Sequence, residues 1–219
     1  MNTGIKHNLT HKVPGESFSC INDYLKNRLY FTHLDEDGIK DMFEYSSKEI
    51  FYRHMGRKPH MNIEDTKDYY KELLGRIKNG HHGGSAMYWF IRTIKDKKTI
   101  GTVGLMGINE KGRIAEIGKG LSPSYWGKGY SYELLGTMIE YTFNDLNMES
   151  IISMTQQSNI PNIKLMATGG FKIKERFKNH IDGVGFKVDY VKLELKKKFS
   201  TPELCYQKAN LKYNKYPGS

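Results

Sequence analysis

The chain has 219 residues, which is enough for one domain with a substantial core. Its 38% hydrophobic and 26% charged residues are typical of a folded protein and exclude an intrinsically disordered one. The formal net charge of +10 favours an anionic partner, and that class includes nucleic acid, membrane surfaces, phosphorylated cofactors and acidic substrates.

The cysteines and the apolar segments exclude several other classes. Cys20 and Cys205 are the only cysteines, so the chain has neither a zinc-binding spacing nor a disulfide framework. No apolar run reaches the roughly 18 residues of a membrane span, and the first residues lack the apolar core of a signal peptide. We therefore expect a cytoplasmic protein without a membrane partner.

The first half of the chain predicts a strand, two helices and then three strands. Residues 1–26 are polar and aperiodic, and we interpret them as an N-terminal arm. Asp35 or Asp37 is expected to cap the first helix, and Gly80 to end the second. Turn signals separate three β-rich runs, which favours an antiparallel meander. The expected elements are a strand at 28–34, helices at 39–46 and 63–79, and strands at 87–94, 99–108 and 113–121.

The second half begins with SPSYWGKGYSYELL at 122–135, where two glycines flank a lysine and an amphipathic helix follows. A helix start of this kind is typical of an anion site, because it offers unpaired N–H groups and the positive end of the helix dipole. The remaining expectations are a strand at 150–157, a short helix at 159–170, strands at 171–177 and 188–198, and a polar tail at 199–219 whose order is left open.

Two common phosphate-binding motifs do not fit this segment. A P-loop requires Ser or Thr after Gly-Lys, but Gly129 follows Lys128, and Ser122 stands where the first glycine should be. A dinucleotide fingerprint requires a third glycine, but Tyr132 occupies that place.

The segment WGKGYSYE at 126–133 instead resembles the acetyl-CoA pyrophosphate loop of the GNAT acetyltransferases. It is most similar to the RimJ/RimL branch, where the loop reads W-G-x-G-Y-A-x-E, and Ser131 here takes the place of the usual alanine. Similar segments flank it: IGTVGL at 100–105, EIGKGL at 116–121, and NIPNIKL followed by GGF within 159–171. The order of the predicted elements also matches this family.

The resemblance implies an α/β (α+β) GNAT fold. Its central sheet is mixed but mostly antiparallel, twisted, has about seven strands, is flanked by helices, and is splayed between strands four and five. The acetyltransferase domain is expected at 27–198, between the arm at 1–26 and the tail at 199–219.

The resemblance also implies acetyl-CoA as the acetyl donor. Backbone N–H groups of 127–132 are expected to bind the pyrophosphate, and the end of the fourth strand to pair with the amides of the pantetheine arm. Asn159 is as well explained as a helix N-cap, and both roles can coexist. The expected cofactor-binding residues are Lys119, Gly120, Leu121, Trp126, Gly127, Lys128, Gly129, Tyr130, Ser131, Tyr132 and Asn159.

For catalysis, Glu116 is the candidate general base, because this family often carries its base on the fourth strand. A solvated side chain on a sheet is the alternative reading. Asn162 stands where the branch usually has Ser, and it is expected to donate a hydrogen bond to the sulfur or to a water. Met166 stands where many members have an acidic Tyr, so the thiolate is expected to leave unaided.

The acceptor pocket is expected between 46–62 and the 178–187 loop, with Tyr52, Arg53 and His54 as substrate-binding residues. Their mixed aromatic and basic character suits a negatively charged amine, such as a nucleotide-linked aminosugar, better than a polyamine. The α-amine of a protein or peptide remains open, as does a catalytically idle, CoA-binding domain.

Other features favour no further site. A solvated loop explains His81-His82 better than a metal site, because adjacent loop side chains are expected to point apart, and no metal is predicted. Lysines near the C-terminus suit an edge strand, which disfavours nucleic acid as a partner. A homodimer is left open.

Overall fold

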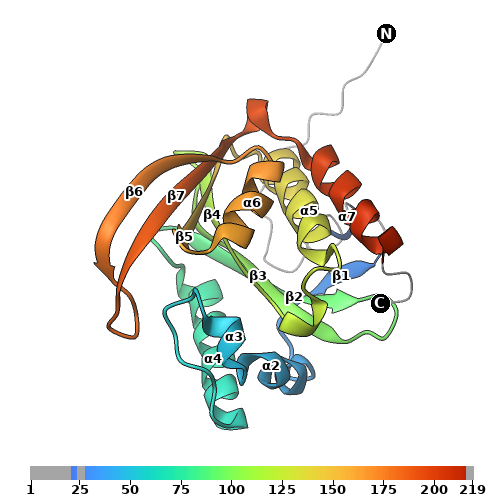
Figure 1. Ribbon diagram of the computed structural model, residues 1–219, viewed down its shortest axis with the longest axis vertical. Coiled ribbons are helices and arrows are strands. Elements are labelled where there is room, and N and C mark those ends of the chain that lie inside the picture. The colour runs from blue at the N-terminus through green and yellow to red at the C-terminus, as the bar shows by residue number, and fades with distance from the viewer. Residues whose placement is uncertain (1–20, 24–27, 216–219) are drawn as a thin grey trace.

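The computed structural model describes residues 21–23 and 28–215 (Figure 1). Seven strands form one sheet in the order β1-β2-β3-β4-β5-β7-β6, in which β4 and β5 are parallel and the other neighbours are antiparallel. The mixed sheet expected from the sequence is therefore confirmed. The strands are β1 Leu29–Thr32, β2 Ser85–Thr93, β3 Thr99–Asn109, β4 Ile114–Leu121, β5 Ser150–Gln156, β6 Lys172–Ile181 and β7 Lys187–Lys196.

Helices cover both faces of this sheet. One face carries α2, α3 and α4, and a cluster of apolar and aromatic side chains fills the space beneath them. The larger core lies under α5 and α6 on the opposite face. The helices are α2 Gly38–Ser46, α3 Glu49–Tyr52, α4 Ile63–Asn79, α5 Tyr130–Asn144, α6 Ile160–Thr168 and α7 Pro202–Lys215, with 3₁₀ turns at Pro123–Tyr125 and Lys197–Phe199.

Local signals explain where the first helices begin and end. Asp35 Oδ1 accepts the Gly38 N–H at 2.9 Å, whereas Asp37 makes no capping hydrogen bond, so Asp35 is the cap of α2. Asn62 and Asp65 form a capping box at the start of α4, and the helix ends before Gly80 as predicted. The short helix α3 was not predicted, because four residues are too few to show a helical period.

The splay between β4 and β5 is the feature of the fold that matters most for function. The two strands pair only from Ile114 to Glu116 and from Ser150 to Ile152. Beyond these residues β4 continues to Leu121 on β3 alone, and β5 continues on β7 alone. A wedge therefore opens in the sheet towards the C-terminal ends of both strands.

The C-terminal segment forms a helix where the sequence left its order open. Helix α7 packs on α5 so closely that a Cβ on Gly136 would lie 2.8 Å from the Tyr206 ring, and the Tyr206 hydroxyl donates to Glu140 Oε2 at 2.5 Å. Most of the predicted N-terminal arm lies outside the described residues, although Ile21 is fully buried in the larger core. None of the described helices is both long and apolar enough to cross a bilayer.

Candidate active site

The glycine-rich loop forms a tight turn directly before α5. Gly127 and Gly129 have φ angles of +77° and +88°, which favour glycine, and Gly129 is the N-cap of α5. The amides that open a helix have no acceptor within it, so those from Gly127 to Ser131 are available to an anion. The Tyr132 N–H differs, because it donates to Gly129 O at 3.0 Å within the first turn.

A buried ion pair holds this loop in place. Arg28 donates from its backbone N–H and from Nε to the two carboxylate oxygens of Glu133, at 2.9 and 3.0 Å. Its Nη1 donates to Lys128 O at 2.8 Å, and the guanidinium lies 4.2 Å from the centroid of the Tyr130 ring. Turning the Lys128 carbonyl towards Arg28 fixes the orientation of the loop. This contact gives a structural role to Glu133, the acid that ends the W-G-x-G-Y-A-x-E motif, to which the sequence alone assigned none.

Trp126 joins the same loop to the end of β4. Its indole Nε1 donates to Leu121 O at 2.6 Å, while 44% of the residue remains exposed. This hydrogen bond therefore fixes the position of the loop, which is expected to bind pyrophosphate, relative to the end of β4, which is expected to bind the pantetheine arm.

Lys119 and Asn162 meet at the wedge between β4 and β5. Lys119 Nζ donates to Asn162 Oδ1 at 2.5 Å, and Asn162 lies in the first turn of α6. Burial of the ammonium lowers the pKa of Lys119 to about 8. Asn159 is the N-cap of α6, with its side chain accepting the Asn162 N–H at 3.3 Å, so the capping role considered for it is present.

A narrow slot of about 190 Å³ lies on the α2–α4 face of the sheet, against the backbone of β4. Gly118 and Gly120 let side chains of this face pack directly on that backbone, because a Cβ on Gly120 would lie 2.8 Å from the Phe51 ring and one on Gly118 2.9 Å from the Met106 methyl. Four tyrosines and two arginines form much of the rest of the lining: Tyr45, Tyr52, Tyr69, Tyr88, Arg57 and Arg76.

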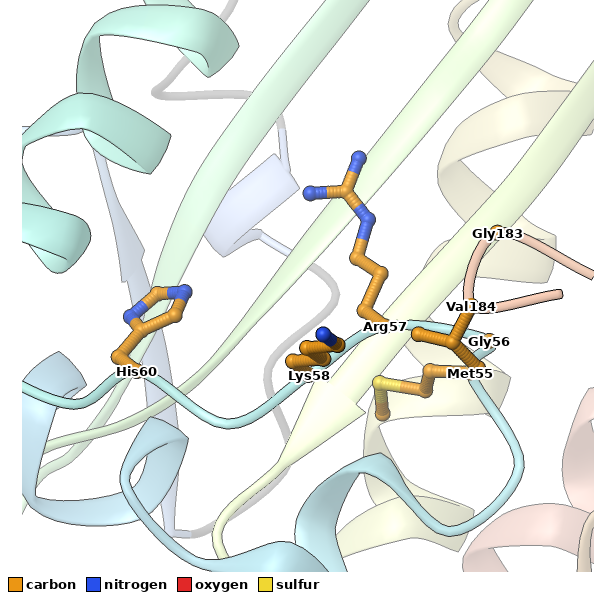
Figure 2. A pocket seen from close by; sticks show the side chains of 7 residues that line it. All are labelled: Met55, Gly56, Arg57, Lys58, His60, Gly183 and Val184. Atoms are coloured by element: carbon orange, nitrogen blue, oxygen red, sulfur yellow. The ribbon is translucent and has the colours of Figure 1, made fainter.

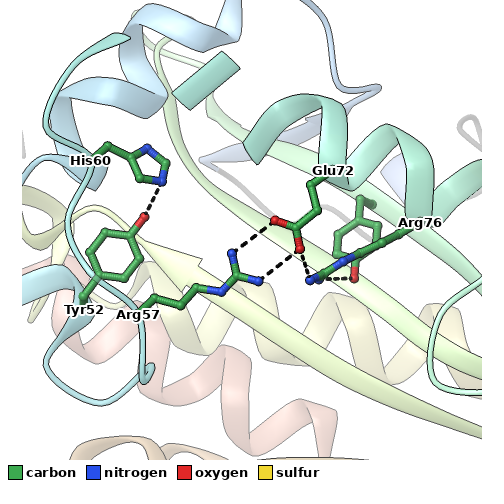
Figure 3. A network of polar contacts seen from close by, with 6 residues as sticks. Tyr52, Arg57, His60, Glu72 and Arg76 are labelled. Atoms are coloured by element: carbon green, nitrogen blue, oxygen red, sulfur yellow. Dashed lines mark hydrogen bonds and ion pairs between the residues drawn. The ribbon is translucent and has the colours of Figure 1, made fainter. Parts of the chain in front are cut away.

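A polar network orders these groups (Figure 3). Glu72 accepts from Arg57 at 3.1 Å and also pairs with Arg76, which in turn donates to the Tyr88 hydroxyl at 3.2 Å. The Tyr52 hydroxyl is 3.0 Å from His60 Nε2. Burial lowers the pKa of His60 below its usual value, so this ring is neutral near pH 7.

A second cavity of about 560 Å³ opens beside the slot (Figure 2). The 46–62 segment and the 178–187 loop meet here, and a Cβ on Gly183 would lie only 2.5 Å from Gly56 O. Tyr52 lines the slot, whereas Arg53 and His54 line neither cavity, and His54 instead contacts Ser158. The lining residues of this cavity are Met55, Gly56, Arg57, Lys58, His60, Gly183 and Val184.

Glu116 has a partner that the sequence did not indicate. Its Oε2 is 2.9 Å from His82 Nδ1, and the two side chains are 23% and 47% exposed. Glu116 pairs with Met106 across β3 and β4, so both side chains lie on the face that carries the slot. The expectation that His81 and His82 point apart is wrong, because their ring centroids are 4.0 Å apart. The Gly107 N–H donates to His81 O at 2.9 Å and holds this turn on β3.

The comparisons with known proteins decide the family. A family model described as an acetyltransferase (GNAT) domain matches residues 28–172. The chain belongs to this family. An uncharacterized N-acetyltransferase p20 from Bacillus licheniformis is 25% identical over 171 residues, which cover 78% of this chain and 94% of that protein. The uncharacterized N-acetyltransferase YoaA of Bacillus subtilis is 30% identical over 148 residues, covering 67% and 80%.

Solved structures agree with this GNAT assignment at the level of the fold. A spermidine N-acetyltransferase from Vibrio cholerae, in complex with CoA and spermine, has a TM-score of 0.65 and 18% identity, covering 78% of this chain and 96% of that one. A GCN5-related N-acetyltransferase from Brucella melitensis has a TM-score of 0.71 and 14% identity, covering 85% and 83%. The RimJ/RimL branch stays a prediction.

As a GNAT acetyltransferase, this protein uses acetyl-CoA as its acetyl donor. The helix start before α5 and the wedge beside β4 are the places where the pyrophosphate and the arm of that molecule are expected to bind. No group of three or more His, Cys, Asp or Glu side chains suited to a metal lies together among residues 21–23 and 28–215.

Proposed function

We propose that this GNAT enzyme transfers the acetyl group to the primary amine of a small molecule that also carries negative charge, such as a nucleotide-linked aminosugar. The observation that carries this proposal is the charge around the two cavities. Arg57, Arg76 and Lys58 line them, and Glu72 is the carboxylate paired to both arginines. Three cations against one carboxylate leave a positive balance, which favours an anion and repels a polyamine.

The dimensions of the two cavities fit such a molecule. The slot of about 190 Å³ reaches the backbone of Gly118 to Gly120, and its tyrosine walls suit a ring with a projecting amine. The adjoining cavity of about 560 Å³ holds Lys58 and one side of Arg57, where a phosphate or carboxylate would lie. We assign the aminosugar ring to the slot and the anionic part to the larger cavity.

Glu116 is the proposed general base. The incoming amine must lose a proton before it attacks the thioester carbonyl. Glu116 lies on the slot face of β4 and is proposed to take this proton, directly or through a water. His82 Nδ1 lies 2.9 Å from the Glu116 carboxylate and the His82 side chain is about half exposed, so it can pass the proton to solvent. Backbone N–H groups of 119–121 are proposed to polarise the thioester carbonyl.

A panel of amines tests this proposal, with CoA thiol release as the readout. Nucleotide-linked aminosugars are compared with free aminosugars, spermidine and peptides with a free α-amine. We expect kcat/KM for the anionic aminosugars to exceed that for spermidine by about tenfold or more, which corresponds to about 1.4 kcal/mol. A preference for spermidine or for peptides would overturn the acceptor assignment, and CoA binding without turnover of any amine would favour an idle domain.

Variants of the larger cavity sharpen the test. Lys58→Gln should raise KM for the anionic acceptor and leave that for the free aminosugar unchanged, because only the former needs the charge. Lys67→Gln, an exposed lysine on α4 paired with Glu64, is the matched control and should change neither value.

A further inference from the structure

The two halves of the active site lie on opposite faces of the sheet. The glycine loop opens α5 on one face, and the acceptor slot lies beneath α2–α4 on the other. The pairing of β4 with β5 ends at Glu116 and Ile152, so the wedge beyond them is where a donor arm can reach the slot. Any acyl donor bound at the loop must therefore bring its reactive end to this wedge.

Lys119 and Asn162 occupy the wedge. Residue 119 of β4 pairs with Val103 of β3, whose side chain belongs to the larger core, so Lys119 points to the α5–α6 face. The residue is partly exposed, and its ammonium lies next to α6. The neutral Asn162 oxygen binds one of the three ammonium hydrogens. Burying a cation opposite a neutral amide is costly, which points to a functional reason for it.

An amine in this place has the chemistry that a thioester leaving group needs. Burial is the cause that lowers the Lys119 pKa to about 8, close to the value of roughly 8.5 for a free thiol. When the pKa of a proton donor is close to that of the group that receives the proton, the proton moves in either direction at little cost in free energy.

We propose that Lys119 is the acid that protonates the departing CoA sulfur, and that Asn162 positions it. This inference rests on the proposed acetyl transfer. The acceptor nitrogen forms its bond to the carbonyl carbon as the C–S bond breaks, and the electron pair of that bond goes to sulfur. A proton moves from Lys119 Nζ to the sulfur to give CoA thiol and a neutral lysine, which solvent then reprotonates. The acceptor ammonium loses one proton through Glu116 to solvent before it attacks, and the nitrogen loses a second proton by the same route after the C–N bond forms. Lys119 therefore supplies the acid that is missing from α6, where Met166 replaces the tyrosine of many family members.

The thiol pKa of bound CoA tests this assignment without any acceptor. Thiolate absorbance in the ultraviolet is titrated for free CoA and for CoA bound to the wild type, to Lys119→Met and to Lys164→Met. Lys164 is exposed on α6, so its variant removes the same charge outside the wedge. An opposite charge within about 4–6 Å shifts a pKa by about 1–3 units, so we expect the bound thiol in the wild type to titrate about one unit below that in Lys119→Met. Lys164→Met should match the wild type.

Kinetics then separate an acid from a fixed charge. Lys119→Arg keeps the cation but cannot release its proton, so it should keep the lowered thiol pKa and lose rate, with kcat reduced about tenfold or more and KM for the acceptor little changed. Equal thiol pKa values in the wild type and Lys119→Met would overturn the inference. If Lys119→Met fails to bind CoA, the wild-type titration alone tests the inference. A thiol of bound CoA whose pKa is no lower than that of free CoA would then contradict a role for Lys119. A lowered thiol pKa without turnover of anionic amines would contradict only the acceptor proposal.

Discussion

The ion pair between Arg28 and Glu133 gives the sharpest stability prediction. The two side chains are only 10% and 3% exposed, and three hydrogen bonds join Arg28 to Glu133 and to Lys128 O. Removing one partner of a buried pair leaves the other charged and uncompensated, which costs about 3–5 kcal/mol. In Glu133→Gln the amide oxygen can still accept the Arg28 N–H, so we expect about 3 kcal/mol, at the lower end of that range.

Urea unfolding of the wild type and Glu133→Gln measures this loss, which corresponds to roughly 6–12 °C in melting temperature for a domain of this size. Asp68→Asn is the matched control, because the Lys71–Asp68 pair on α4 is 71% and 76% exposed and should contribute nothing measurable. A loss below about 1 kcal/mol for Glu133→Gln would refute the reasoning, because it would mean that water reaches Arg28 and replaces the carboxylate.

The remaining predictions concern the donor and the proton transfers. Ser131→Asp places a charge in the first turn of α5, where it stabilises the helix but repels pyrophosphate, so CoA affinity measured by calorimetry should fall about tenfold or more, whereas Ser131→Ala should keep it. Glu116→Gln should lower kcat, leave CoA affinity unchanged and flatten the acidic limb of the pH profile; a full-rate variant would return Glu116 to a structural role. His82→Ala should slow turnover less than Glu116→Gln, and an equal or larger loss would make His82 the base. Lys119 releases its proton at a lower pH in the folded state than in the unfolded chain, where its pKa is near the ordinary lysine value of about 10.5. Wild-type stability should therefore rise relative to Lys119→Met between about pH 8 and pH 10.5. Urea unfolding at several pH values measures this, and a constant difference would contradict it.

Much of the fold could be predicted because its signals are local. The helix at 63–79, its glycine stop and the three strands that follow depend on periodicity and turn residues that neighbours in the sequence supply. The splay between β4 and β5 is different in kind. It depends on where a parallel pair separated by a helix stops pairing, and only the family resemblance indicated it.

The parts of the site that escaped prediction all involve distant residues. Arg28 and Glu133 are 105 positions apart, His82 and Glu116 are 34, and Lys119 was assigned only a backbone role. A basic segment such as 53–58 predicts a cationic pocket, but the sequence does not indicate which of its cations face that pocket. Arg57 and Lys58 do, whereas Arg53 lines neither cavity.

Helix α7 contacts the turn that opens α5, although it lies far from that turn in the chain. It lies beyond residue 172, where the match to the family model ends, yet Ala209 O lies 2.7 Å from where a Cβ of Gly129 would be. The turn that opens α5 is therefore shaped partly by a helix about 80 positions later in the chain. If docking of α7 changes the affinity of the turn for an anion, binding of the anion changes the docking of α7 by the same free energy. A change that displaces α7 is therefore expected to alter acetyl-CoA binding without touching its site.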